Sequence, residues 1–296
     1  MSAPRAIQAR LLADDRRLYL NDGPIDLVIE AVGEPTEVRA AYAQAVAAFG
    51  GLLDGLCAEL RRLRAPLGEE KPVFAGPIAR RMLEACWPLR ADFITPMAAV
   101  AGALADHMCQ HLCAGRNLAR AYVNDGGDIA FHLAPGENLT CGLICDLAVP
   151  GIDATVALGS DMKVRGIATS GWAHKGTGGR SFSLGIADAV TVLAADAAAA
   201  DAAATIVANA VDLPGHAAIA RRPAIELDPD SDLGTRAVTT GVGALDPQEI
   251  AAALAAGVAK ARALRRAGLI HGAVLVLRQR YGAVGVGRAI AARDTA

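Results

Sequence analysis

The sequence predicts an α+β protein in which mixed sheets pack against alanine-rich helices. Strand-like and helix-like segments both occur, but they do not alternate as a strict βαβ repeat. Apolar residues make up 53% of the chain and aromatic residues only 4%. The core must therefore rely on small side chains and close backbone approach. The length of 296 residues allows one large domain or two modest ones, and we expect a single unit covering residues 1–296.

The first third of the chain is expected to hold a hairpin and a long helix. Residues 25–31 alternate in polarity and follow the turn sequence Asn21-Asp-Gly-Pro24, so they pair with residues 18–20 as a β-hairpin. An alanine-rich helix opens at Pro35 and is expected to run to about residue 63. Residues 72–93 contain three prolines and are expected to be irregular, with one short helix.

The middle of the chain is expected to be rich in strands. Thr95-Pro96 predicts a helix over residues 96–113, with Thr95 as N-cap and Pro96 at the first helical position. Apolar segments then predict short strands over residues 121–123, 138–149, 154–158, 164–169 and 191–193.

The last third is expected to begin with an alanine-rich helix over residues 195–210. Residues 223–234 are expected to be loop. Asp246-Pro-Gln-Glu249 has the pattern of a capping box and predicts a helix to about residue 267, ended by Gly268. Residues 269–277 are expected to form the final strand.

Charge and composition exclude several classes of partner. The net charge is −2, which gives no reason to expect nucleic acid. The N-terminus has no apolar region of the length of a secretory signal, and Asp196 and Asp201 interrupt the longest apolar window, residues 190–211. We therefore expect a cytoplasmic protein with no membrane partner. The cysteines are expected to be reduced thiols: Cys57, Cys86, Cys109, Cys113, Cys141 and Cys145.

Three short segments could carry chemistry. Asn124-Asp125-Gly126-Gly127-Asp128 combines glycines, which let a ligand approach the backbone, with carboxylates that could face a metal. Thr169-Ser170-Gly171 at a strand end suits phosphate or carbonyl binding through backbone N–H groups. Ordinary turns explain both segments equally well.

The third segment is Asp201 and Thr205, which are four residues apart and share one face of the expected helix. An Asp and a Thr hydroxyl are oxygen ligands of the kind that Mg²⁺ prefers, together with phosphate and water. The alternative is that they only solubilise an alanine helix.

The ordered set Asn-x-Gly-Gly-Asp, Ala-Thr-Ser-Gly, Val-Thr-Val and Ala-Asp-x-x-x-Thr resembles the ApbE superfamily of FMN transferases, over residues 95–210. The small-residue run Ala98-Ala-Val-Ala-Gly102 is similar to that family's glycine-rich patch. The resemblance implies an ApbE-like (T-fold-like) fold, Mg²⁺ held by Asp201 and Thr205, and an FAD cleft. The cleft residues it implies are Asn124, Gly126, Gly127, Asp128, Thr169, Ser170 and Gly171.

The chain departs from the family in one stretch. Flavin transferases carry His-Ile-x-Asp-Pro-x-Thr-Gly between Thr-Ser-Gly and Val-Thr-Val, whereas this chain has a different sequence from Gly176 to Asp188. The missing histidine would activate an acceptor hydroxyl, and general-base help is typically worth about 10²–10⁴ in rate. His174 is the nearest candidate for a catalytic base, and a solvated loop histidine is the alternative. The pattern looks most like a sub-branch whose activity the resemblance does not define.

A second metal hypothesis concerns His107, Cys109, His111 and Cys113 on one expected helix. The histidine pair and the cysteine pair point about 200° apart on a helical wheel, so one helix cannot gather all four around an ion. Cys141 and Cys145 could join one pair. Buried cysteines of an alanine-rich core are the better explanation.

Together these observations predict an FAD- or nucleotide-binding protein with Mg²⁺. An active protein would transfer FMN from FAD to an acceptor, which could be a protein. The alternatives are an enzyme acting on another nucleotide-like coenzyme, in coenzyme biosynthesis, and a non-catalytic flavin-binding protein. A structural or oligomerisation role without a ligand is a third alternative. The sequence leaves open whether the chain forms a homo-oligomer.

Overall fold

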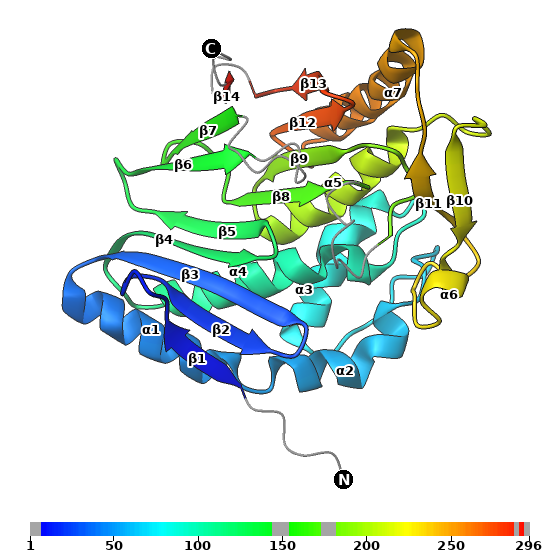
Figure 1. Cartoon of the computed structure of the whole chain (residues 1–296). Helices are drawn as coiled ribbons and strands as arrows, with labels where there is room; N and C mark the ends of the chain where they lie inside the picture. The colour runs from blue at the N-terminus through cyan, green and yellow to red at the C-terminus, as the bar shows by residue number, and fades with distance from the viewer. Residues whose placement is uncertain (1–6, 144–153, 173–181, 287–289, 293–296) are drawn as a thin grey trace.

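A nine-stranded antiparallel sheet runs through the centre of the molecule (Figure 1). The computed structural model describes residues 7–143, 154–172, 182–286 and 290–292. The strand order is β1-β2-β3-β4-β5-β8-β9-β12-β13. These strands are β1 (Gln8–Leu11), β2 (Leu18–Asp22), β3 (Ile25–Gly33), β4 (Leu118–Asp125), β5 (Asp128–Leu133), β8 (Gly166–Ser170), β9 (Ala189–Ala194), β12 (Gly272–Leu277) and β13 (Arg280–Val284).

Helices cover one face of this sheet (Figure 1). Helix α4 packs against β4 and β5, α5 against β8 and β9, and α7 against β12 and β13. The helices are α1 (Pro35–Phe49), α2 (Leu52–Leu63), α3 (Pro77–Cys86), α4 (Val100–Cys113), α5 (Ala197–Ala210), α6 (Ala224–Leu227) and α7 (Pro247–Arg266), with short 3₁₀ helices at Trp87–Leu89 and Pro96–Ala99. The described architecture is therefore α+β, as the sequence predicts.

A smaller sheet lies against the opposite face. It contains β6 (Asn138–Leu143), β7 (Ala154–Gly159) and β14 (Ile290–Ala292). Val156 and Leu158 of this sheet share a small apolar core with Phe131 and Ile167 of the large sheet. Because side chains alternate along a strand, the neighbouring Ala168 faces the helices instead. A two-stranded ribbon, β10 (Ile219–Pro223) and β11 (Ala237–Val242), completes the structure.

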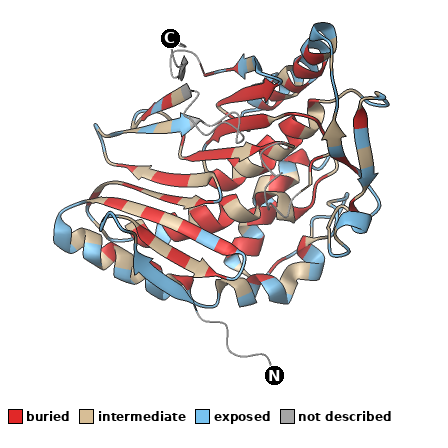
Figure 2. Ribbon diagram, viewed as in Figure 1, coloured by how far each residue is buried: buried red, intermediate tan, exposed pale blue. Residues whose placement is uncertain are grey.

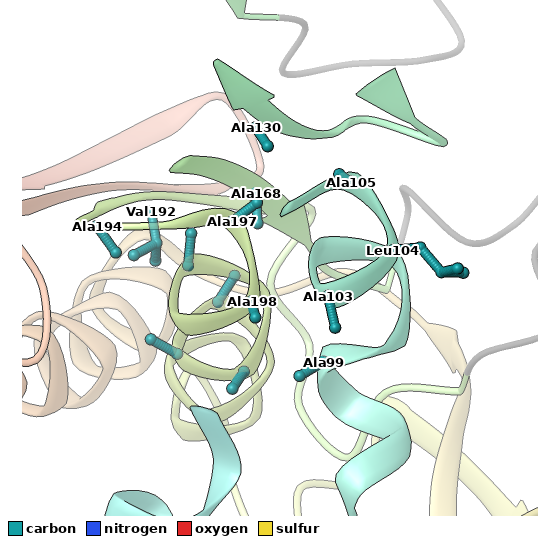
Figure 3. Packing of buried hydrophobic residues seen from close by; sticks show 14 of the residues in the cluster. Ala99, Ala103, Leu104, Ala105, Ala130, Ala168, Val192, Ala194, Ala197 and Ala198 are labelled. Carbon is teal, nitrogen blue, oxygen red and sulfur yellow. The ribbon is translucent and has the colours of Figure 1, made fainter. Parts of the chain in front are cut away.

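Helix α5 is the most deeply buried helix, as the red interior of Figure 2 indicates, and nine of its fourteen residues are buried. A Cβ added at Gly102 of α4 would lie 2.3 Å from the carbonyl oxygen of Ala197, and one at Gly166 of β8 would lie 2.0 Å from the carbonyl carbon of Asp196. Real Cβ atoms do not approach so closely, so both positions need glycine. Figure 3 shows the alanines of α4, α5 and β8 that fill this region. The expected core of small side chains is confirmed.

Several expected elements are confirmed. The β2–β3 hairpin and α5 lie close to their expected bounds. The capping box of α7 is complete: the Asp246 carboxylate accepts from the backbone N–H groups of Gln248 and Glu249 at 2.8 Å, and the Glu249 carboxylate accepts from the Asp246 N–H at 2.7 Å.

Two helix predictions need correction. The helix expected over residues 35–63 is two helices, because the chain breaks at Gly50 and Gly51, where Gly51 has a left-handed φ of 78°. The helix expected from Pro96 begins as a 3₁₀ helix and becomes α-helical at Val100. Thr95 does not cap it, since its hydroxyl donates to the Asp232 carboxylate instead.

The strand predictions were incomplete. Residues 269–277 do not form the final strand, because β13 and β14 follow β12. The expected loop over residues 223–234 contains the short helix α6 and is flanked by β10 and β11. Residues 144–149 of the strand expected over 138–149 lie outside the described residues.

Among the described helices, none is by itself long and apolar enough to cross a membrane. The bent pair α1–α2 meets the length and composition criteria only when its two helices are taken together.

Candidate functional site

The diglycine motif forms the turn between β4 and β5. Asp125 pairs with Asp128, which leaves Gly126 and Gly127 as a two-residue hairpin turn with φ values of 62° and 109°. Two positive φ angles in succession require this kind of sequence. The Asn124 side-chain oxygen accepts from the Gly127 N–H at 2.8 Å and fixes the turn. The glycines therefore have a conformational role, whatever they bind.

The sheet brings the second and third motifs beside the first. The Asp128 carboxylate accepts from the Thr169 N–H at 3.2 Å, joining β5 to β8. The hydroxyl of Thr169 lies 2.9 Å from that of Thr191 on β9. The segments Gly-Gly-Asp, Thr-Ser-Gly and Val-Thr-Val thus lie side by side on the neighbouring strands β5, β8 and β9.

Ser170 and Gly171 lie at the end of β8. Ser170 is buried. Gly171 has a φ of 152°, and a Cβ there would lie 2.5 Å from the carbonyl oxygen of Asp188. This glycine is needed for close packing of β8 on the segment before β9. A ligand role for its backbone stays a prediction.

Asp201 and Thr205 lie on the side of α5 that faces the start of α4. The Asp201 carboxylate accepts from the Gly102 N–H at 3.1 Å, in the first turn of α4. Both side chains are partly exposed, whereas Ala202, Ala203 and Ala204 between them are buried. A helix N-terminus favours negative charge, so the first turn of α4 is a favourable position for this carboxylate.

Asp125 lies close enough to Asp201 for their charges to interact, although the family resemblance does not place it among the cleft residues. It is 8% exposed and lies at the end of β4 on the helix-facing side, in line with Ala121 and Val123. Burial and then the charge of Asp201 raise the pKa of Asp125 to about 8, opposed by a hydrogen bond from the Asp26 backbone. The alternating burial along β4 is the sequence signal that could have identified it.

The donor set fits a hard divalent cation. Asp125 and Asp201 could supply carboxylate oxygens and Thr205 a hydroxyl. Within the described residues no group of three or more His, Cys, Asp or Glu side chains is arranged to hold a metal ion. Mg²⁺ usually takes only one or two protein carboxylates and completes its shell with phosphate and water.

A separate ion cluster anchors the N-terminus of α5. The Asp106 carboxylate accepts from the backbone N–H groups of Ala197 and Ala198 at 2.9 and 3.0 Å. Arg81 pairs with Asp106 at 3.3 Å and with Asp196 at 2.5 Å. Burial raises the pKa of Asp106 to about 6 against the opposing effect of the backbone hydrogen bonds. This cluster fixes α5 beside α4, and so positions Asp201.

The second metal hypothesis finds no support in the described residues. The rings of His107 and His111 on α4 lie with centroids 4.5 Å apart and their planes tilted by 58°, and no metal-binding group of described residues forms around them. Cys86 and Cys109 are buried, as expected for core cysteines, but Cys57 is exposed. Cys145 lies outside the described residues.

His174 also lies outside the described residues, within 173–181, so its relation to the site stays a prediction.

Two hollows of the described surface lie elsewhere. One, of about 380 Å³, is lined by residues of β3, β4 and β6, including Glu30 and Tyr122. The other, of about 360 Å³, is lined by residues of α7 and β13.

Known proteins resemble this chain over different lengths. A UPF0280 protein of Methanothermobacter thermautotrophicus is 36% identical over 143 residues, which is 48% of this chain and 52% of that protein. A UPF0280 protein of Methanothrix thermoacetophila is 36% identical over 138 residues, 46% of this chain and 53% of that protein. The chain thus spans about half the length of the curated relatives it matches.

Among solved structures, a mutant of Flavin Transferase ApbE from Vibrio cholerae aligns over 96% of this chain and 98% of its own, at 12% identity and a TM-score of 0.41. That similarity is too distant to transfer residue roles. A family model described as AbpE bacteria matches residues 9–287. Because this match covers nearly the whole chain, the protein belongs to the AbpE bacteria family.

Proposed function

We propose that this protein binds FAD, or a related nucleotide, together with Mg²⁺ at Asp201 and Thr205. The observation that carries the proposal is the 3.1 Å hydrogen bond from the Gly102 N–H to Asp201. It sets the carboxylate at the first turn of α4. The charge of Asp201 also acts on Asp125, which directly precedes the diglycine turn. These contacts support a site in which the end of β4, the start of α4 and the Asp201 side of α5 lie together.

The residues have separable roles in this proposal. Asp201 and Asp125 supply negative charge to the cation, and Thr205 supplies a neutral oxygen one helical turn away. The backbone at Gly126, where an added Cβ would meet nothing within 4 Å, offers open space for phosphate oxygens. When bound, Mg²⁺ neutralises charge on the phosphates.

FMN transfer is the finer part of the proposal. An acceptor hydroxyl oxygen would form a bond to the FMN phosphorus of FAD while the pyrophosphate P–O bond breaks, releasing AMP. The hydroxyl proton must pass to a base. His174 is the candidate on the chain, and water as the acceptor would give FMN and AMP by hydrolysis.

Two other functions remain as alternatives. The difference from the flavin-transferase pattern between Gly176 and Asp188 favours a protein that kept the cleft and lost the base. It equally favours an enzyme that acts on another nucleotide-like coenzyme in the same cleft. Incubation with FAD and Mg²⁺, followed by chromatography for FMN and AMP, separates the transferase from both.

The test of binding is a thermal-shift titration with FAD, FMN and ADP, each with and without Mg²⁺. Ligand at about 100 times its Kd stabilises the folded state by about 2.7 kcal/mol. We expect Asp201→Ala and Thr205→Val to remove the Mg²⁺-dependent part of the shift. Asp54→Ala, at an exposed carboxylate on α2, is the matched control and should respond like the parent. Equal Mg²⁺-dependent shifts in all four proteins would refute the metal assignment.

A further inference from the structure

A row of arginines lines a hollow at the other end of the molecule from the candidate site. Arg262, Arg265 and Arg266 lie in the last turns of α7 and are exposed. With Ala283, Val284 and Gly285 they line a hollow of about 360 Å³. Its lining residues come from α7 and β13, which lie at the top of Figure 1. Spacings of three and four residues place these side chains on one side of the helix.

The charge of this region differs from that of the whole chain. Residues 250–293 contain eight Lys and Arg residues and no Asp or Glu, although the chain carries a net charge of −2. Lys260 in the same helix pairs with Asp92 at 2.9 Å. In the part of the chain that the structure describes, no carboxylate pairs with the three arginines of the hollow.

Arg265 is held in place by the backbone around it. Its Nε donates to the carbonyl oxygen of His271 at 3.1 Å. A Cβ at Gly285 would lie 2.5 Å from the same Nε, so this glycine, with a φ of 69°, lets the side chain cross the backbone closely. The hollow thus has one positioned guanidinium, that of Arg265, and two others from the same helix.

The strand register separates this hollow from the Gly171 end of the candidate site. On β12, Ala273 pairs with Val284, which lines the hollow. Val276, three residues further along β12, pairs with Ala189. Ala189 follows Asp188, which packs on Gly171 at the candidate cleft. Three residues of strand span roughly 10 Å, and the two regions lie at opposite ends of β12.

We propose that this hollow is a second ligand site, for the phosphate groups of a small anionic molecule. Guanidinium groups bind phosphate oxygens in bidentate pairs, and an anion relieves the repulsion among three cations on one helix face. A volume of about 360 Å³ is within the range of small-molecule sites, roughly 300–1,000 Å³. Cations in the last helical turn also stabilise a helix through its dipole, and that role needs no ligand.

The test is calorimetric titration with inorganic pyrophosphate and, separately, with ADP, in EDTA and at low salt. We expect Arg262→Gln/Arg266→Gln to weaken pyrophosphate binding at least 10-fold. The control Arg39→Gln/Arg61→Gln removes two exposed arginines from α1 and α2 and should bind like the parent. Tighter binding of ADP than of pyrophosphate would identify a nucleotide as the ligand. Equal binding of the two would show that the site recognises the phosphate groups alone. Both results agree with the proposal.

Three results would overturn it: no pyrophosphate binding by the parent at 1 mM, equal loss in the control variant, or equal binding in the Arg262/Arg266 variant. A lower thermal midpoint of that variant with unchanged binding would show that the arginines serve the helix dipole only. Asp201→Asn keeps full pyrophosphate binding without Mg²⁺ if the site is separate. The Mg²⁺ assignment at Asp201 can therefore fail while this proposal holds, and this proposal can fail while the Mg²⁺ assignment holds. Loss of pyrophosphate binding in Asp201→Asn would contradict the proposal that the two sites are separate.

Discussion

At the scale of single residues, carboxylates organise the region around α4 and α5. Asp201 accepts from the first turn of α4, while Asp106 accepts from the first turn of α5. Each helix N-terminus therefore faces an acid from the other helix, an arrangement that the helix dipole favours. The repulsion between the carboxylates of Asp201 and the buried Asp125 works against this favourable arrangement. A bound cation would relieve that repulsion.

The raised pKa of Asp106 predicts how the free energy of unfolding depends on pH. Its folded-state pKa of about 6 lies above the ordinary value of 3.8 for an aspartate, so the folded state binds this proton more tightly. The resulting stabilisation is full below pH 4 and is lost as the pH rises through 6. In Asp106→Asn this loss is absent. From pH 4 to 7 the variant should gain up to about 3 kcal/mol relative to the parent, measured by urea denaturation.

A constant difference between the two proteins across that pH range would show that Asp106 titrates normally. Asp92→Asn provides a comparison, because Asp92 is a more exposed acid in an ion pair with Lys260.

At the scale of elements, the packing of α4 on α5 depends on a glycine. Gly102→Ala would place a methyl group 2.3 Å from the backbone oxygen of Ala197, so the helices must separate. We expect a loss of roughly 2–3 kcal/mol in the free energy of unfolding, in the range typical of overpacked cores. Gly55→Ala is the matched control, because Gly55 lies in α2 with nothing within 4 Å of its added Cβ.

The control should be stabilised by about 0.5–1 kcal/mol, since alanine is the better helix former. Chemical denaturation of both variants measures the two effects. Equal changes in stability in the two variants would contradict the proposed contact between α4 and α5.

The sequence predicts the elements with strong local signals and misses those that depend on tertiary contacts. The turn Asn21–Pro24 and the Asp246 capping box identify the β2–β3 hairpin and α7 without reference to the rest of the fold. Strand β1 is exposed along its length, and β13 carries exposed residues at the sheet edge, so neither shows a clear alternation of polarity. The break between α1 and α2 depends on only two glycines in a long helical pattern.

The same contrast holds within the candidate site. The motifs predict that Gly126, Thr169 and Asp201 belong together, and the sheet register and the α4 contact bring their segments to one end of the molecule. Asp125 occupies a variable position of the motif, and its importance follows from burial on the helix-facing side of β4. The close fit of Gly171 on Asp188 likewise depends on tertiary packing.

At the scale of the whole molecule, the large sheet has a different partner on each face. The helices bury one face with alanine and glycine contacts, and the small sheet buries part of the other around Phe131. The motif segments gather at one end of the sheet, while the arginine hollow lies beside β13 at the opposite end. That the chain forms a single unit stays a prediction, as do its cytoplasmic location and its acceptor.

The most direct test of the central claim is a crystal structure with Mn²⁺ in place of Mg²⁺ and ADP, using the anomalous signal of the metal. We predict one Mn²⁺ peak in direct contact with the Asp201 carboxylate and the Thr205 hydroxyl, with metal-to-oxygen distances of about 2.0–2.3 Å. A well-ordered crystal with ADP bound and the Mn²⁺ peak elsewhere, or with no peak at α5, would contradict it.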